Sequence, residues 1–270
     1  MNSIKDAKRI VFKVGSSTLT HETGLINIRR VEQLVKVLAD IKNMGKDIIL
    51  VTSGAIAVGV GKLGFKRKPD DIPGIQAAAA VGQCELMYMY DKSFSEYNHT
   101  VAQILLTRDV IENEHRKENV INTFERLLGM NVIPVVNEND TVAVEELEAV
   151  DKFGDNDTLS AIVASLVNAD LLVIMSDIDG LYTDNPRTNP NAKLIERVDS
   201  IDGYIESIAM GAGTSRGTGG MATKISAAKI ATANGVAMSI MRGDNPELIY
   251  QLLECKNVGT YFSPGKKQTI

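Results

Sequence analysis

Apolar runs alternate with amphipathic stretches along most of this chain. Continuous apolar runs predict strands at 10–14, 47–51, 101–106, 131–136, 171–175 and 236–241. Between them, apolar residues recur at helical spacing, which predicts helices over 28–41, 75–90, 112–128, 159–167 and 221–233. Apolar strands that alternate with helices are typical of a mainly parallel sheet with both faces covered. We therefore predict an α/β fold, a three-layer αβα sandwich around a mainly parallel sheet.

The composition is consistent with one well-packed domain. The 270 residues are 44% hydrophobic and 23% charged, enough for one large core or for two closely packed lobes. No apolar run approaches the roughly 20 residues that a membrane helix needs, and the N-terminus lacks the apolar segment of a secretion signal. We therefore expect a single domain over 1–270, located in the cytoplasm and not bound to a membrane.

Charge and cysteine content argue against several other classes of protein. The net charge is −5 and the longest basic block is Lys66-Arg67-Lys68, expected on a surface loop, so nucleic-acid binding is not expected. Cys84 and Cys255 are far apart, and the three histidines lack the spacing of metal ligands. Neither a disulfide framework nor a zinc site is indicated.

A glycine-rich segment with a lysine, Gly217 to Lys224, leads into the predicted helix at 221–233. Glycines let backbone N–H groups close around an anion, the helix start adds partial positive charge, and a nearby lysine can reach a phosphate. The segment is not a Walker A motif. The alternative interpretation is a flexible loop before a helix.

Two other segments favour phosphate chemistry. The strand at 10–14 carries Lys13 and ends at Gly15-Ser16-Ser17, so it places a cation next to a tight turn. Without the other motifs, this lysine would be interpreted as a solvated residue of an edge strand. The strand at 171–175 ends in Ser176-Asp177 and a turn rich in glycine, aspartate and proline. Open α/β sheets bind nucleotides at such strand ends.

Further polar turns suit a small charged substrate. Small residues and hydroxyls at 52–55 let a carboxylate or phosphate approach the backbone closely, although Ser53 could instead cap a helix. Acids and amides follow one strand at 137–140 and precede a helix at 154–157. This density of carboxylates suits an ammonium group or a metal ion, and capping or turn formation is the alternative.

The G-x-G-x-x-G pattern at Gly59 to Gly64 matches a dinucleotide-binding fingerprint. That fingerprint directly follows a strand, whereas this copy follows a helix-forming stretch. We interpret it as a helix end.

Together these motifs resemble the amino acid kinase family over essentially the whole chain. The family's K-x-G-S/T-S/T pattern reads here as Lys13 to Ser17. V-T-S-G-A-I at 51–56 is the version of the second loop found in the branch that phosphorylates glutamate, whereas other branches usually have consecutive glycines there. The resemblance continues with V-N-E-N-D at 136–140, G-D-N-D at 154–157, G-L-Y-T-x-x-P at 180–186 and G-T-G-G-M-x-T-K at 217–224.

The resemblance implies transfer of the γ-phosphoryl group of ATP to the side-chain carboxylate of L-glutamate, giving L-glutamyl 5-phosphate at the entry to proline biosynthesis. It implies a glutamate-binding lobe over about 1–168 and an ATP-binding lobe over about 169–270. The implied catalytic residues are Lys13, Lys224 and Asp157. The lysines stabilise charge on the transferred group, and Asp157 orients them.

The implied ligand contacts are as follows. L-Glutamate is bound by Ser53, Gly54, Asn156 and Asp140, the last holding its ammonium group. ATP is bound by Lys13, Ser176, Asp177, Thr218, Gly219, Gly220, Met221, Ala222, Thr223 and Lys224. Mg²⁺ is expected to be held mainly through the ATP phosphates, without a protein metal site. No general base is needed because a carboxylate is already ionised at neutral pH.

The family also implies homo-oligomers, commonly dimers or tetramers, and feedback inhibition by L-proline. Many members that act on glutamate continue into an RNA-binding-like PUA domain, which we do not expect here. Ser176 stands where threonine is common, and the acidic segment 141–153 looks longer than in some relatives, which bears on the affinity for glutamate.

Two other functions are compatible with parts of this pattern. The nearest is a related kinase acting on aspartate, carbamate or a nucleoside monophosphate, and the loops at 52–55 and 137–140 argue against it. The other is a sensor that kept the fold and lost the chemistry. A sensor predicts loss of a lysine, yet Lys13 and Lys224 are both present.

Overall fold

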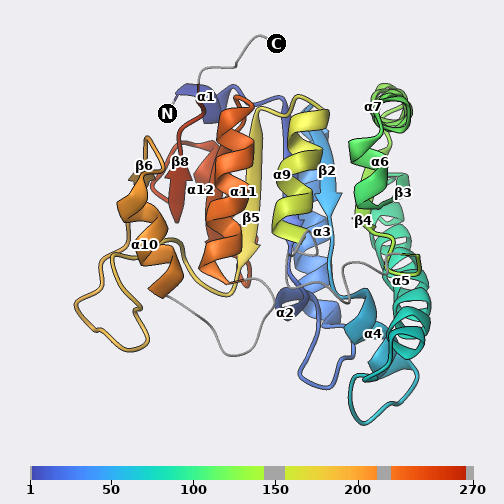
Figure 1. Ribbon diagram of the computed structural model, residues 1–270. Coiled ribbons are helices and arrows are strands. Elements are labelled where there is room, and N and C mark those ends of the chain that lie inside the picture. The colour runs from blue at the N-terminus through green and yellow to red at the C-terminus, as the bar shows by residue number, and fades with distance from the viewer. Residues whose placement is uncertain (1, 143–155, 212–219, 266–270) are drawn as a thin grey trace. The chain divides into compact units, whose positions relative to one another are not determined.

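A computed structural model describes residues 2–142, 156–211 and 220–265 of the chain (Figure 1). The chain forms two compact units, and the first of them is discontinuous in sequence. It comprises Met1–Lys13 and Asp155–Ile270, whereas the second comprises Val14–Gly154. The division into a glutamate-binding and an ATP-binding lobe stays a prediction.

The first unit contains helices and strands from both ends of the chain. In chain order they are α1 (Asn2–Lys5), β1 (Arg9–Val14), α9 (Asn156–Leu166), β5 (Leu171–Ser176), β6 (Arg197–Val198), α10 (Gly203–Gly211), α11 (Met221–Ala233), β7 (Ala237–Arg242), α12 (Leu248–Leu253) and β8 (Thr260–Phe262). The strand order is β1-β5-β7-β8-β6. β5 and β7 are parallel, whereas β8 is antiparallel to β7.

An inner strand of the first unit, β5, is buried on both faces. Every residue of β5 is buried, as its unbroken apolar sequence predicts for a covered parallel strand. α9 and α11 pack against each other, α9 over β5 and α11 over β7 (Figure 1). The first turns of α9 and α11 are thereby brought together.

The second unit is formed by the continuous segment between these two parts. Its elements are α2 (Ser16–Leu19), α3 (Ile28–Asn43), β2 (Asp47–Val51), α4 (Ala55–Lys62), α5 (Ile72–Ser95), β3 (Val101–Leu106), α6 (Arg108–Glu112), α7 (Glu114–Gly129) and β4 (Ile133–Glu138). The strands are parallel and lie in the order β3-β4-β2. Because they are parallel, their carboxyl ends and the polar turns that follow lie at one edge.

The α/β fold predicted from the sequence is confirmed, with a mainly parallel sheet flanked by helices. The predicted helix 112–128 corresponds to α7, which begins at Glu114 because Asn113 caps it and its side chain accepts a hydrogen bond from the N–H of Arg116. The short helix α6 before it was not predicted. The short elements β6, β8, α10 and α12 were not predicted. In the parts of the chain that are described, no helix is long and apolar enough to span a membrane.

The glycines of the G-x-G-x-x-G pattern serve helix packing. Gly59 lies on α4, and a Cβ added there would be 1.8 Å from the carbonyl oxygen of Ala78 on α5. A Cβ at Gly82 on α5 would be 1.7 Å from the carbonyl oxygen of Ala55 on α4. The interpretation as a helix end is confirmed, since α4 ends at Lys62, and the glycines allow α4 and α5 to approach closely.

We expect Gly82→Ala to lower the free energy of unfolding by about 3 kcal/mol, because the new methyl group has no space against backbone atoms. Gly129→Ala is the matched control, since Gly129 ends α7 and a Cβ there meets no atom within 4 Å. Urea denaturation of both variants measures the difference. Equal stability of the two variants would contradict the packing role.

Candidate active site

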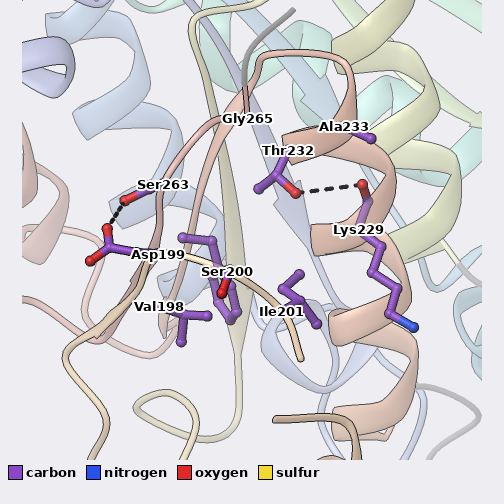
Figure 2. A pocket seen from close by; sticks show the side chains of 10 residues that line it. Val198, Asp199, Ser200, Ile201, Lys229, Thr232, Ala233, Ser263 and Gly265 are labelled. Atoms are coloured by element: carbon purple, nitrogen blue, oxygen red, sulfur yellow. Dashed lines mark hydrogen bonds between the residues drawn. The ribbon is translucent and has the colours of Figure 1, made fainter. Parts of the chain in front are cut away.

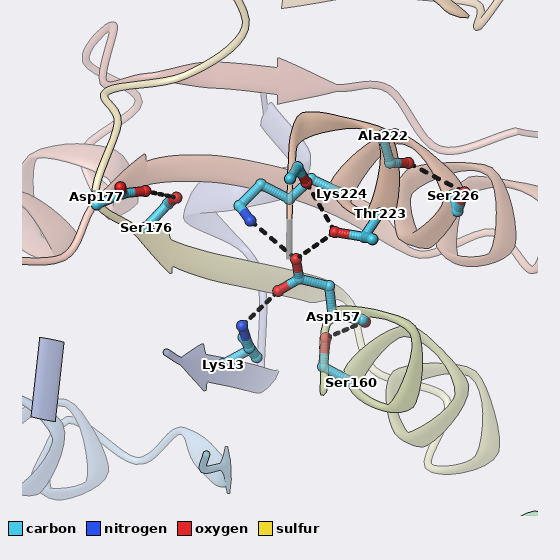
Figure 3. Close-up of polar contacts among 10 residues, drawn as sticks. Lys13, Asp157, Ser160, Ser176, Asp177, Ala222, Thr223, Lys224 and Ser226 are labelled. Atoms are coloured by element: carbon cyan, nitrogen blue, oxygen red, sulfur yellow. Dashed lines mark hydrogen bonds and ion pairs between the residues drawn. The ribbon is translucent and has the colours of Figure 1, made fainter. Parts of the chain in front are cut away.

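Two lysines and an aspartate form a buried cluster in the first unit (Figure 3). Lys13 lies on β1, Asp157 is the second residue of α9, and Lys224 lies in the first turn of α11. Lys13 Nζ is 2.6 Å from Asp157 Oδ1, and Lys224 Nζ is 2.9 Å from Asp157 Oδ2. Asp157 is fully buried, and the lysines are only 7% and 5% exposed. The structure thus brings together the three residues predicted to be catalytic, and their catalytic role stays a prediction.

Asp157 is held ionised by its neighbours. Burial alone would raise the pKa of its carboxyl group, but the ammonium groups of Lys13 and Lys224 outweigh burial and keep the pKa below its ordinary value. The Thr223 hydroxyl lies 3.1 Å from Asp157 Oδ2, and the Ser160 hydroxyl donates to the Asp157 carbonyl oxygen at 2.6 Å. The three charged side chains together carry one net positive charge, which suits an anionic ligand.

The first turn of α11 adds to this positive character. The N-cap is Gly220, which has no side chain to satisfy the N–H groups of the turn. A helix of 13 residues that begins in this way favours phosphate oxygens at its N-terminus. Met221 is buried and Ala222 is exposed in the same turn. The predicted ATP contacts Thr218 and Gly219 lie outside the described residues.

The other predicted nucleotide contacts end β5. The Ser176 hydroxyl donates to Asp177 Oδ1 at 3.2 Å. Asp177 is exposed, and its second oxygen lies 3.4 Å from Arg187 Nη2. The Gly243 N–H donates to the Ser176 carbonyl oxygen at 2.7 Å, which fixes the end of β5 against the end of β7.

The predicted glutamate contacts occur in both units. Asn156 is the first residue of α9, directly before Asp157, and so belongs to the first unit. Ser53, Gly54 and Asp140 belong to the second. Gly54 is the N-cap of α4 and has a left-handed conformation, with φ of 94°. Ser53 is therefore not the N-cap residue, which removes the capping interpretation for its side chain.

Asp140 follows β4 and is mostly buried. Burial raises the pKa of its carboxyl group to about 6, although Lys68 opposes this by lowering it. A buried carboxylate of this kind gains from a cationic partner such as a substrate ammonium group. Lys68 was predicted only to lie on a surface loop. It is exposed as predicted, but its effect on Asp140 was missed because a charge interaction across 72 residues leaves no local pattern.

Two buried polar contacts from α5 also escaped the sequence analysis. The Tyr90 hydroxyl lies 2.9 Å from Thr52 Oγ1, directly after β2. The Asn137 side-chain amide donates to Gln83 Oε1 at 2.8 Å, near the end of β4. Gln83 and Tyr90 are seven residues apart and so share a helix face. A glutamine on the apolar face of an alanine-rich helix was the pattern that could have drawn attention to them.

The first unit also contains a pocket of about 280 Å³ (Figure 2). It is lined by Val198, Asp199, Ser200, Ile201, Lys229, Thr232, Ala233, Phe262, Ser263 and Gly265. Its charged groups already have partners: Lys229 pairs with Glu206 at 2.7 Å, and Asp199 accepts a hydrogen bond from Ser263 at 2.6 Å. None of the predicted site residues lines it.

Within 2–142, 156–211 and 220–265, no group of three or more histidine, cysteine, aspartate or glutamate side chains could hold a metal ion. The prediction that Mg²⁺ is held through the phosphates of ATP stays a prediction.

Comparison with known proteins finds a matching family and several similar proteins that share one name. Residues 8–242 match the model of the amino acid kinase family. Glutamate 5-kinase of Clostridium perfringens is 56% identical over 264 residues, 98% of each chain. Glutamate 5-kinase of Listeria welshimeri is 52% identical and covers 98% of this chain and 96% of its own, and that of Enterococcus faecalis is also 52% identical, over 98% and 97%.

Solved structures with the same fold have lower identity. Carbamate kinase from Giardia lamblia bound to AMP-PNP has a TM-score of 0.66 at 16% identity, covering 96% of this chain and 99% of its own. Isopentenyl phosphate kinase of T. acidophilum has a TM-score of 0.62 at 17% identity, covering 94% and 99%. At these identities the likeness shows the fold alone.

Proposed function

Because this chain belongs to the amino acid kinase family, we propose that it transfers the γ-phosphoryl group of ATP to the side-chain carboxylate of L-glutamate. The product is L-glutamyl 5-phosphate, and the reaction is the first step of proline biosynthesis. Relatives named glutamate 5-kinase that are 52–56% identical and match nearly end to end support this acceptor. The buried cluster of Lys13, Asp157 and Lys224 is the single structural observation that carries the proposal.

In the first unit, the two lysines stabilise the transferred group. Phosphoryl transfer places charge on the equatorial oxygens, and the main task of the protein is to position and neutralise them. Lys13 and Lys224 supply ammonium groups, and the single Asp157 carboxylate holds both at fixed distances. Because the cluster is buried, its charges act with less screening than they would in water. The first turn of α11 donates N–H groups to the phosphates, and Ser176 and Asp177 contact the nucleotide.

In the second unit, Asp140 pairs with the ammonium group of L-glutamate. Ser53 binds the substrate through its hydroxyl, and the left-handed Gly54 leaves the backbone there open to a carboxylate. Asn156 in the first unit adds an amide. No residue has to remove a proton, because the attacking side-chain carboxylate of glutamate is already ionised at neutral pH.

Mg²⁺ fits this arrangement as a partner of the nucleotide. It usually keeps several waters and binds through substrate phosphates, so it needs no dedicated cage of protein ligands. When bound together with ATP, it would neutralise charge that develops on the phosphate oxygens during the transfer.

Trapping of the product with hydroxylamine tests the proposed reaction. The protein is incubated with ATP and Mg²⁺ and offered L-glutamate, L-aspartate, N-acetylglutamate or uridine monophosphate separately, with nucleotide release followed in parallel. Hydroxamate from glutamate alone is the expected result, because an acyl phosphate reacts with hydroxylamine. Turnover with another acceptor would reassign the substrate, and binding of ATP or glutamate without any turnover would favour the sensor.

Three further properties belong to the proposal. L-Proline acts as a feedback inhibitor, the protein forms a homo-oligomer, a dimer or a tetramer, and the reaction takes place in the cytoplasm. The named relatives support these statements only through the family they share. Inhibition by proline in the hydroxamate assay and the mass in light scattering test the first two.

A further inference from the structure

A buried glutamine in the second unit has an amide group that is only half satisfied. Gln83 is 8% exposed, and its Oε1 accepts a hydrogen bond from Asn137 Nδ2 at 2.8 Å. Its Nε2 is buried and has no hydrogen-bond partner among the residues that the structure describes. A buried donor left without an acceptor costs about 1–3 kcal/mol, so the protein retains this group at the expense of stability.

Gln83 lies next to one of the two turns assigned to the acceptor, and its chain neighbour Gly82 lies next to the other. Asn137 lies at the carboxyl end of β4, where the segment leading to Asp140 begins. The neighbouring residue Gly82 packs against the carbonyl oxygen of Ala55, one residue after Gly54. Both contacts lie within the second unit. The Gln83 side chain therefore contacts the turn at 137–140, and the adjacent Gly82 packs beside the turn at 52–55.

The missing partner of Nε2 must supply an acceptor atom. An amide N–H donor is matched by a carbonyl or carboxylate oxygen, and a carboxylate gives the stronger hydrogen bond. L-Glutamate carries two carboxylates and, under the proposed function, binds between these turns. Ser53, Gly54 and Asp140, the three acceptor contacts predicted in these turns, account for its ammonium group and for only part of its oxygens.

We propose that Gln83 is a substrate-binding residue of the acceptor site, whose Nε2 donates a hydrogen bond to a carboxylate oxygen of L-glutamate while Oε1 orients Asn137. This inference rests on the proposed function, since it takes L-glutamate as the acceptor. Substrate binding then completes the hydrogen bonding of Gln83. The chain gives up stability in the absence of substrate and gains affinity in its presence.

Two substitutions of Gln83 distinguish the role of its Nε2 donor from that of its Oε1 acceptor. Gln83→Met keeps the length and removes both polar groups, whereas Gln83→Glu keeps an oxygen for Asn137 and removes the Nε2 donor. We expect each to raise the glutamate KM by about 10- to 150-fold, the range for a lost hydrogen bond to a charged group. The KM for ATP is expected to change by less than about twofold, because the nucleotide contacts lie in the first unit.

His99→Leu is the matched control. His99 is also 8% exposed and in the second unit, and its side chain makes a hydrogen bond of 3.3 Å with the Ala39 carbonyl oxygen. It lies just before the N-terminal end of β3, whereas Asn137 lies at the carboxyl end of the parallel strand β4. His99→Leu should lower the melting temperature and leave the glutamate KM unchanged.

A double-mutant cycle with Asn137→Ala distinguishes direct contact from an effect through Asn137. In the Asn137→Ala background, Gln83→Met should still raise the glutamate KM by about tenfold if Nε2 touches the substrate. No further rise would overturn the direct contact. Equal rises in the KM values for ATP and glutamate, with a melting temperature as low as that of His99→Leu, would also overturn it.

The unmodified protein is assayed first for formation of hydroxamate from glutamate. If it turns over another acceptor or none, the proposed function fails, whatever the variants do. If it turns over glutamate and the Gln83 variants keep its KM, only the role of Gln83 fails. Should Gln83→Met not fold, Gln83→Glu tests the same contact, because it retains the oxygen that Asn137 needs.

Discussion

Lys224→Ala is expected to lower kcat by about 10³-fold, because a cation aimed at developing charge in a water-poor site is worth several kcal/mol in the transition state. The glutamate KM should change far less, since Lys224 lies in the first unit and Ser53 and Asp140 lie in the second. Steady-state kinetics with both substrates measures the two effects separately.

The fold should survive this substitution. Removal of the Lys224 ammonium group leaves Asp157 still paired with Lys13 at 2.6 Å, so no buried charge loses its last opposite charge within the cluster. Lys229→Ala is the matched control, because Lys229 lies on the same helix and is exposed, with Glu206 as its partner. A Lys224→Ala variant with near-normal kcat would refute the catalytic role.

Asp140→Asn is expected to raise the glutamate KM by about 10²-fold while kcat falls little, because a neutral amide cannot match the charge of an ammonium group. Asp91→Asn on α5 replaces an exposed aspartate of the same unit and serves as the control. Unchanged glutamate affinity in Asp140→Asn would place the ammonium site elsewhere.

The same substitution should stabilise the substrate-free protein above about pH 6. The pKa of Asp140 is raised from 3.8 to about 6, so the folded protein holds this proton more tightly than the unfolded chain does. The contribution of Asp140 to stability is therefore complete below about pH 4 and is lost as the pH rises through about 6. Asp140→Asn should recover up to about 3 kcal/mol at pH 8 in urea denaturation.

In the unmodified protein, activity toward glutamate should rise with pH over the range in which the contribution of Asp140 to stability is lost. Only the ionised carboxylate attracts an ammonium group, so kcat/KM for glutamate should fall as the pH drops below about 6. Asp140→Asn should lack this limb of the profile. A limb that persists in the variant would mean that another group is responsible.

The main strands and helices could be predicted from the sequence, whereas the residues that contact the predicted site residues could not. Apolar runs of strand length and the polar residues at their ends located Lys13, Ser176 and the turn before Asp140, because a parallel sheet brings its carboxyl ends to one edge. The pairing of both lysines with Asp157 also agrees with the sequence prediction, although that prediction came from the family resemblance and not from spacing.

Contacts between distant residues were beyond the reach of these patterns. Lys68 shifts the pKa of Asp140 across 72 residues, and Gln83 binds Asn137 across 54. In the sequence alone, Lys68 looks like any solvated surface lysine and Gln83 like any residue of a helix, so neither interaction could be predicted. The short strand β8 was missed for another reason: it has three residues, which are too few to show a period.

The discontinuity of the first unit has a consequence for how the chain is made. Residues 14–154 leave the ribosome as one continuous segment and can fold while synthesis goes on. β1 is made before this segment, but β5, its neighbour within the first unit, emerges only after it. The Lys13 ammonium group meets Asp157 only after more than half of the chain is synthesised, and the second lysine of the cluster arrives later still. The part that carries the phosphoryl-transfer cluster is thus the last to be completed, so a prematurely terminated chain presents the turns assigned to glutamate without the machinery to phosphorylate it.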